Sequence, residues 1–176
     1  MGILRPIGSF ILKAAIYGCV AIVVLTLAVR GVMSFADGPW EIVPGGPFTT
    51  GEAASFPEDR SFLHDVDEVQ FQLLSTGSSR TAWIAEHNNR LFIPSGYMNT
   101  TYGKIWKQWP KHAEKDGAAI LRVDDKLYTL NLKRILVDPD LEEVLAELSR
   151  KYSSGGPTQL SRVADGDLWI FELIPT

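Results

Sequence analysis

The stretch from Pro94 to Pro110 holds the densest group of side chains that could bind a ligand. It contains four large aromatic residues, three hydroxyls, an asparagine and two lysines, flanked by apolar runs typical of strands. Aromatic rings can stack on a flat molecule, and cationic side chains can bind an anion. The composition of this stretch therefore predicts a site for a small planar or phosphorylated molecule.

The same side chains also have plainer interpretations. Trp106 and Trp109 lie three residues apart, which would put both on one helical face in the core. Lys104, Lys107 and Lys111 have helical spacing too, and could form a solvated face, an anion or phosphate site, or a contact with acidic headgroups. These alternatives stay open at this point.

Elsewhere the sequence shows no pattern of a catalytic or metal centre. His64, His87 and His112 are far apart, and the single cysteine, Cys19, lies in an apolar run, so we expect no metal site. No Gly-x-Ser-x-Gly motif and no acid–base pair is present, which leaves catalytic residues unassigned. A net charge of −4 with scattered basic residues argues against nucleic-acid binding.

The N-terminal segment predicts a membrane-spanning helix. Ala14 to Val29 is sixteen residues without a charge, about 24 Å long as a helix. Residues 10–12 bring it close to the ~30 Å of a bilayer core. We predict that residues 1–36 are an uncleaved anchor in the lipid bilayer. A signal peptide cleaved near Ala36 is the alternative, although Arg30 before that position argues against cleavage; a buried core helix is the third interpretation.

Charges around this segment predict its orientation. Arg5 and Lys13 precede the apolar run, whereas Arg30 is followed by Asp37 and Glu41. The positive-inside rule then puts the N-terminus in the cytoplasm and the rest of the chain on the far side, the periplasm in a bacterium. Residues 37–60, rich in glycine and proline, are predicted as a linker, and residues 61–176 as the folded domain.

The sequence pattern of the folded domain indicates mainly β structure. Alternation and turn residues predict six strands, at 68–74, 80–87, 91–93, 118–123, 126–137 and 167–174. A short helix over 103–114 is broken near Pro110, and a longer one starting at Asp138-Pro139 carries an apolar stripe. These elements predict an α+β fold: an antiparallel six-stranded barrel with a helix in its C-terminal half, after one transmembrane helix.

Three segments resemble a known group in this order. They are Thr76-Gly-Ser-Ser-Arg80 between the first two strands, Leu91-Phe-Ile-Pro-Ser-Gly96 ending the third, and Trp106 to Lys111 followed by Ala119-Ile-Leu-Arg-Val. The arrangement resembles the split β-barrel of flavin- and deazaflavin-binding oxidoreductases, the pyridoxamine-phosphate-oxidase-like group. Within that group it is most similar to the deazaflavin-dependent nitroreductases. The resemblance covers roughly residues 68–136.

The resemblance implies a bound FMN or deazaflavin, an oxidoreductase activity and a homodimer. It implies a site whose members are, by position, Ser78, Ser79 and Arg80 near a cofactor phosphate, Ser95, Gly96 and Tyr97 along the ring, and Lys104 and Trp106 closing the pocket. The alternative is a non-catalytic module that uses the same barrel to bind a ligand or a partner, because a fold does not decide a function.

Overall fold

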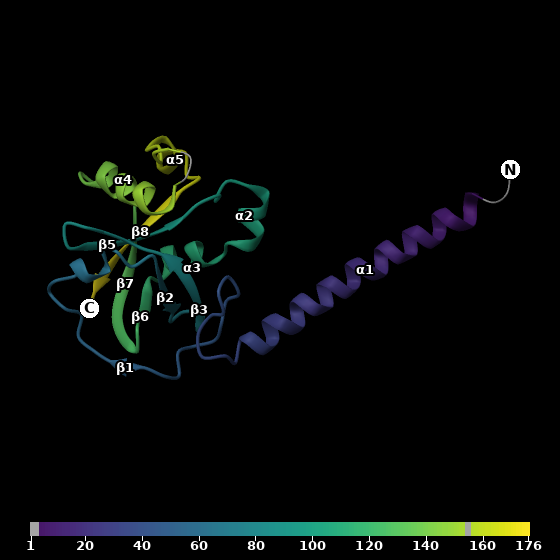
Figure 1. The fold of residues 1–176 in the computed structure, drawn as a ribbon, viewed down its shortest axis with the longest axis horizontal. Coiled ribbons are helices and arrows are strands. Elements are labelled where there is room, and N and C mark those ends of the chain that lie inside the picture. Colours follow the sequence, from purple (N-terminus) through teal and green to yellow (C-terminus); the bar gives the residue numbers. More distant parts are fainter. Residues whose placement is uncertain (1–3, 154–155) are drawn as a thin grey trace.

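The computed structural model describes residues 4–153 and 156–176. A long helix, α1 (Leu4–Met33), projects from a domain built on one curled sheet (Figure 1). Within α1, Ser9–Met33 is long and apolar enough to cross a membrane. The most apolar part of this helix is not buried against the rest of the protein. A membrane span and a signal sequence are both compatible with such a helix.

The sheet is antiparallel and curls until its two ends meet. Its strands are β2 (Glu68–Leu73), β3 (Ser78–Trp83), β4 (Ala85–His87), β5 (Arg90–Ser95), β6 (Ala118–Val123), β7 (Lys126–Ile135) and β8 (Trp169–Pro175), with β1 (Glu52–Ala53) parallel to β7. Their order is β3-β2-β6-β7-β8-β5-β4. The end strands β3 and β4 are separated in the chain by Ile84 alone, so the sheet must close on itself. The predicted α+β split-barrel class is confirmed.

The sheet has eight strands where six were predicted. The predicted strand 80–87 bends at Ile84 and becomes β3 and β4. The hydroxyl of Tyr152 holds this bend, because it accepts from the N–H of Ile84 at 3.0 Å and donates to the carbonyl of Ile84 at 2.7 Å. Glu52–Ala53 adds the remaining strand. The local alternation of apolar and polar residues reveals neither a bend that a distant helix stabilises nor a strand of two residues.

Two hairpin turns lie where the sequence predicts them. Asn88 and Asn89 join β4 to β5 with φ of 51° and 61°, and Asp124 begins the turn between β6 and β7 with φ of 52°. Asn and Asp tolerate this left-handed conformation better than most residues. Two successive positive φ values suit the right-handed twist of a two-residue hairpin. These turns fix the register of both strand pairs.

The helices depart from the prediction in two places. The predicted helix 103–114 is two helices, α2 (Thr101–Trp106) and α3 (Trp109–Lys115), since Pro110 lies in the first turn of α3. The expectation that Trp106 and Trp109 share a helical face is therefore wrong: Trp109 is buried, whereas Trp106 is 47% exposed. Helix α4 (Leu141–Tyr152) begins two residues after Pro139; Asp138, expected as its cap, accepts from the N–H of Asp140 at 3.0 Å and also bonds to Arg90.

Two buried groups of side chains stabilise the domain. One fills the curled sheet and includes Phe71, Trp109 and Phe171. The other lies between the sheet and α4, with α5 (Ser161–Ala164) beside it, and contains the predicted apolar stripe Leu141, Val144, Leu145 and Leu148. Burying each such aliphatic side chain contributes roughly 1.5–3 kcal/mol. The two cores pack on opposite faces of the strands they share, as alternation along β5 and β8 requires.

The segment 37–60 includes β1 and is followed by a short 3₁₀ helix at Ser61–Leu63. Its first part lies on the outer face of β2 and β6, whereas Ala54 and Phe56 pack against the core inside the sheet. The N–H of Phe48 donates to Gln72 Oε1 at 2.8 Å. Arg122 donates to Gln70 Oε1 at 2.6 Å and pairs with Asp37 at 3.2 Å. The polar face of β2 is thus covered by chain that immediately follows α1.

Candidate functional site

Arg80 lies on the inner side of the curled sheet. Its cross-strand partner on β2 is Phe71, which is fully buried, and residues directly opposite one another in a sheet point to the same face. The guanidinium carbon of Arg80 is 5.9 Å from the ring centre of Trp109, which meets Phe71 edge-on at 5.0 Å. A cation is therefore placed against the aromatic wall of the core.

The charge of Arg80 is not neutralised by the protein. Within residues 4–153 and 156–176, no carboxylate forms an ion pair with it, and its Nε atom is buried without a hydrogen-bond partner. Its side chain donates only to the hydroxyl of Ser78, at 3.4 Å, as far as the described residues go. Burial, and then the nearby charge of Arg30, lower the pKa of Arg80 to about 10. Because an unpaired buried charge is costly, an anion bound here would be stabilised.

Lys107, just after α2, is a second cation near the predicted site. Its ammonium donates to the carbonyl of Gly96 at 3.0 Å and lies 5.8 Å from the ring centre of Tyr97. Burial lowers the pKa of Lys107, and the charge of Asp167 opposes that change. The site prediction did not include Lys107; its helical spacing from Lys104 was the available signal.

The loop that carries Gly96 and Tyr97 is tightly built. Tyr97 has a φ of 62°, and its carbonyl accepts from the hydroxyl of Thr100 at 2.8 Å. That hydroxyl in turn accepts from the N–H of Gly103 at 2.9 Å and caps α2. A Cβ atom at Gly103 would lie 1.8 Å from the Tyr97 carbonyl oxygen, so only glycine fits. These contacts between Tyr97, Thr100 and Gly103 therefore hold the loop and α2 together.

All three predicted serines use their hydroxyl groups inside the protein, and that of Ser78 donates to the carbonyl of Gly45 at 3.3 Å. Ser79 is fully buried and donates to the carbonyl of Gly46 at 2.6 Å, while its backbone pairs with Gly45. Ser95 is also buried and donates to the sulfur of Met98 at 3.5 Å. The sequence could not reveal the contact of Ser79, because Gly46 lies 33 residues away.

Lys104 and Trp106 lie on the exposed side of α2. The ring of Trp106 stacks on Tyr102 at 6.2 Å, and the guanidinium carbon of Arg30, in the last turn of α1, lies 5.8 Å from its centre. Helix α2 is on the side of the domain that faces α1 (Figure 1). Arg30 thus contacts Trp106 and is near enough to Arg80 for its charge to lower the pKa of Arg80, while Lys107 contacts both Gly96 and Tyr97.

The described surface also has an open depression of about 650 Å³ away from these residues. Its lining comes from the α3–β6 connection and from β7, and includes Lys115, Asp116, Asn131, Leu136 and Arg134. Arg134 ion-pairs with Glu114 at 2.6 Å and lies 3.5 Å over the ring of Trp169. None of the predicted site residues is among the residues that line this depression.

Known proteins give little help with the site. No protein-family model matches the chain, and no curated protein matches it. A solved structure described as "Putative Pyridoxamine 5'-phosphate oxidase" from Listeria innocua is similar, with a TM-score of 0.45 and 10% identity, over 65% of this chain and 88% of that chain. This likeness concerns the course of the chain alone and says nothing of ligand or activity.

Proposed function

We propose that the chain is a membrane-anchored domain that binds a phosphate-bearing ligand at Arg80. The observation that carries the proposal is the partly buried guanidinium of Arg80, which has no carboxylate partner in the described part of the chain. A planar guanidinium can donate two parallel hydrogen bonds to phosphate oxygens. A phosphate would supply both the acceptor for the unpartnered Nε atom and the opposite charge.

A flavin nucleotide, FMN or deazaflavin, is the ligand class proposed for this site. The sequence resemblance over residues 68–136 implies it, and Arg80 fits its phosphate. Tyr97 and Gly96, held beside Lys107, would approach the ring from the loop after β5. When bound, a flavin supplies hydride transfer, and the residues of this chain supply binding and charge. On this proposal the protein is an oxidoreductase.

A module that binds the ligand without turnover is the second candidate. It is favoured by the chemistry around Arg80: the described contacts of its guanidinium are a hydroxyl and an aromatic ring, and neither is a general acid or base. Flavin reduction by a reductant, followed by reoxidation by an acceptor, separates the two candidates. A bound flavin that cannot be reduced and reoxidised through many cycles would assign the protein to the second.

The full chain in detergent micelles or nanodiscs allows the binding test. FMN, riboflavin and inorganic phosphate are titrated while flavin fluorescence and thermal unfolding are followed. We expect FMN to bind about tenfold or more tightly than riboflavin, because a charge-assisted hydrogen bond contributes roughly 1.5–3 kcal/mol. Arg80→Met should reduce FMN affinity to the level of riboflavin.

Arg134→Met is the matched control for that variant. Arg134 also has a buried Nε atom without a partner in the described residues and also lies over a tryptophan, but it is paired with Glu114. Its substitution should leave FMN affinity unchanged. Equal FMN affinity in the wild type and in Arg80→Met would reject Arg80 as the phosphate ligand.

The membrane anchor and the orientation of the domain have their own test. The mass of the protein extracted from membranes should include residues 1–36, and protease added outside intact cells or spheroplasts should reach the folded domain. A mature N-terminus at Asp37 would instead identify α1 as a cleaved signal. The homodimer implied by the resemblance stays a prediction that light scattering of the purified protein can check.

A further inference from the structure

Helix α2 exposes an unusual set of apolar side chains. We define the α2 surface as Tyr102, Ile105 and Trp106, which are 65%, 74% and 47% exposed. A helix on a domain surface normally turns its apolar side toward the core. In α2 the buried residue is Gly103, and the large apolar side chains face outward. A contiguous exposed apolar patch of this kind marks an interaction site.

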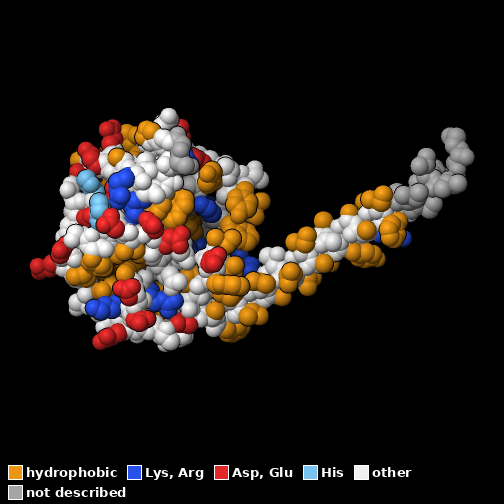
Figure 2. Space-filling model, in the orientation of Figure 1, with side chains coloured by type: hydrophobic (Ala, Val, Ile, Leu, Met, Phe, Trp, Pro, Cys, Tyr) orange, Lys and Arg blue, Asp and Glu red, His pale blue; other side chains and the backbone are white. Residues whose placement is uncertain are grey.

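The residues that follow α1 extend this patch. Phe35, Trp40 and Ile42 are 90%, 69% and 91% exposed. Trp40 and Ile42 belong to a tight turn in which Trp40 and Val43 exchange backbone hydrogen bonds, and Glu41 has a φ of 47°. The turn therefore presents these side chains in a fixed way. Hydrophobic side chains gather at the base of α1 and around α2 (Figure 2).

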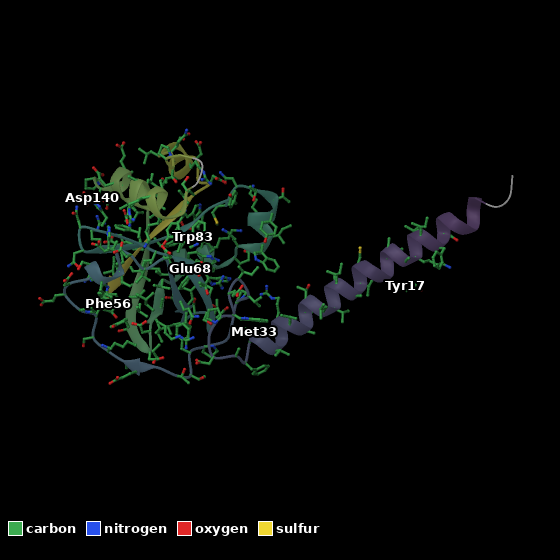
Figure 3. The ribbon with its side chains drawn as sticks, in the orientation of Figure 1. Tyr17, Met33, Phe56, Glu68, Trp83 and Asp140 are labelled. Carbon is green, nitrogen blue, oxygen red and sulfur yellow. The ribbon has the colours of Figure 1, made fainter. Side chains whose placement is uncertain are left out.

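The position of the patch relative to α1 indicates its partner. The contact between Arg30 and Trp106 brings the α2 surface beside the end of the apolar helix. Met33, which ends α1, lies at the edge of the domain from which that helix departs (Figure 3). Residues at the end of a membrane span lie at the level of the lipid headgroups, where tryptophan and tyrosine are enriched.

The charges beside the α2 surface fit an anionic membrane. Arg30 and Lys104 flank its aromatic side chains. Cations near an anionic membrane surface are attracted to it. Long cationic side chains can also place their apolar stems in the boundary region while their charges stay among the headgroups.

We infer that the α2 surface docks on the same bilayer that α1 crosses, with Ile105 and Trp106 at the boundary between headgroups and acyl chains. The sequence resemblance implies that Trp106 closes a cofactor pocket; its outward ring and its contact with Arg30 favour lipid instead. The inference rests on the membrane anchor of the proposed function and is independent of the ligand at Arg80. Docking would hold the domain in one orientation on the membrane.

Tryptophan fluorescence tests this inference with the full chain. The protein is reconstituted into vesicles of phosphatidylcholine and phosphatidylglycerol, with and without lipids brominated near the start of the acyl chain, which quench nearby tryptophans. Trp106→Phe should remove a large share of the quenching. Trp83→Phe is the matched control, because Trp83 is 49% exposed and also stacks on a tyrosine, Tyr152. It should leave the quenching unchanged.

The outcomes separate docking from the other proposals. Equal quenching in the wild type, Trp106→Phe and Trp83→Phe would overturn docking, and so would unchanged quenching in Ile105→Asp. If alkaline carbonate releases the protein from the vesicles, α1 does not anchor the protein in the bilayer. Reduced quenching in Ile105→Asp with unchanged FMN affinity would support docking as a property separate from ligand binding. Quenching that persists without phosphatidylglycerol would overturn the role of the cations.

Discussion

Arg80 and Arg90 lie in the same sheet and have opposite electrostatic environments. Each guanidinium carbon lies over an aromatic ring, Arg80 at 5.9 Å from Trp109 and Arg90 at 5.0 Å from Phe92. Arg90 donates to Glu172 at 2.7 Å and to Asp138 at 2.8 Å. These bonds raise the pKa of Arg90, whereas burial lowers that of Arg80.

The difference separates an arginine whose charge the fold uses from one whose charge has no carboxylate partner among the described residues. Arg90 ties β5 to β8 and to the chain before α4, so its charge is used by the fold. Arg80 has a hydroxyl and an aromatic ring as neighbours where Arg90 has carboxylates, which leaves its charge available to an external anion. The carboxylate partners of Arg90 lie 48 and 82 residues away, so the sequence alone cannot tell the two arginines apart.

Removal of Arg90 should have the largest effect on stability. Arg90→Met leaves the carboxylates of Glu172 and Asp138 without their main partner, and we expect a loss of about 3 kcal/mol in the free energy of unfolding. Urea unfolding of the full chain in detergent, followed by near-ultraviolet circular dichroism, measures it. An unchanged midpoint and slope would mean that water replaces Arg90 at no cost.

Removal of Arg80 should have the opposite sign. Arg80→Met replaces a desolvated cation with an apolar side chain, so the ligand-free domain should gain about 1–2 kcal/mol while FMN affinity falls. Stability gained together with binding lost is typical of a functional site. Arg134→Met, which breaks the pair with Glu114, should give no such gain. A destabilised Arg80→Met would show that Arg80 serves the fold as Arg90 does.

The two arginines should also differ in acid. The hydrogen bond from Arg90 is the main cause that lowers the pKa of Asp138 below its ordinary value of 3.8. A carboxylate with a lowered pKa in the fold stabilises the protein above its unfolded pKa, and this contribution is lost as pH falls through the folded value. Below about pH 4, the wild type and Arg80→Met should lose stability in parallel, and Arg90→Met should lose about 1 kcal/mol less.

Unfolding midpoints measured from pH 6 down to about pH 2.5 would show this difference as a shallower slope for Arg90→Met. Asp37 also has a lowered pKa, chiefly through the hydroxyl of Thr50, and supplies a background slope common to all three proteins. Identical slopes in the three proteins would assign the acid sensitivity to Asp37 and not to the Arg90 pairs.

Ser78→Ala should have the smallest effect. The bond from Arg80 to the Ser78 hydroxyl is long, at 3.4 Å, and so is the bond from that hydroxyl to the carbonyl of Gly45, at 3.3 Å; the loss of both should change the free energy of unfolding by less than about 0.5 kcal/mol. FMN affinity should stay within about threefold of the wild type. A loss of FMN binding as large as that of Arg80→Met would make Ser78 a direct ligand of the phosphate.

Local signals in the sequence predicted those parts of the fold that local interactions form. The Asn88-Asn89 turn, the apolar stripe of α4 and the alternation of β7 were all readable, because each depends on neighbours within a few residues. The bend at Ile84 was not readable, since the side chain that holds it, Tyr152, is 68 residues away. The cover over Gln72 depends on a contact of the same long-range kind.

For the candidate site, the sequence predicted where the loop after β5 lies, but it predicted few of the contacts that the side chains make. The turn residues identified Arg80, and the breakers around Gly96 and Tyr97 identified the loop after β5. The burial of the Ser79 hydroxyl against Gly46 and the contact of Trp106 with Arg30 arise from chain that approaches from the N-terminal segment. The spacing of residues within a motif does not reveal which of them a distant segment of the chain will contact.

The position of β8 has a consequence for how the domain is made. Strand β8 (Trp169–Pro175) lies between β7 and β5, so it joins the half of the sheet that contains β2, β3, β6 and β7 to the half that contains β4 and β5. A chain synthesised from its N-terminus completes α1 and both halves before the strand that unites them. Sheets with such distant pairings fold slowly. The domain therefore stays open until β8 has been made and takes its place between β7 and β5.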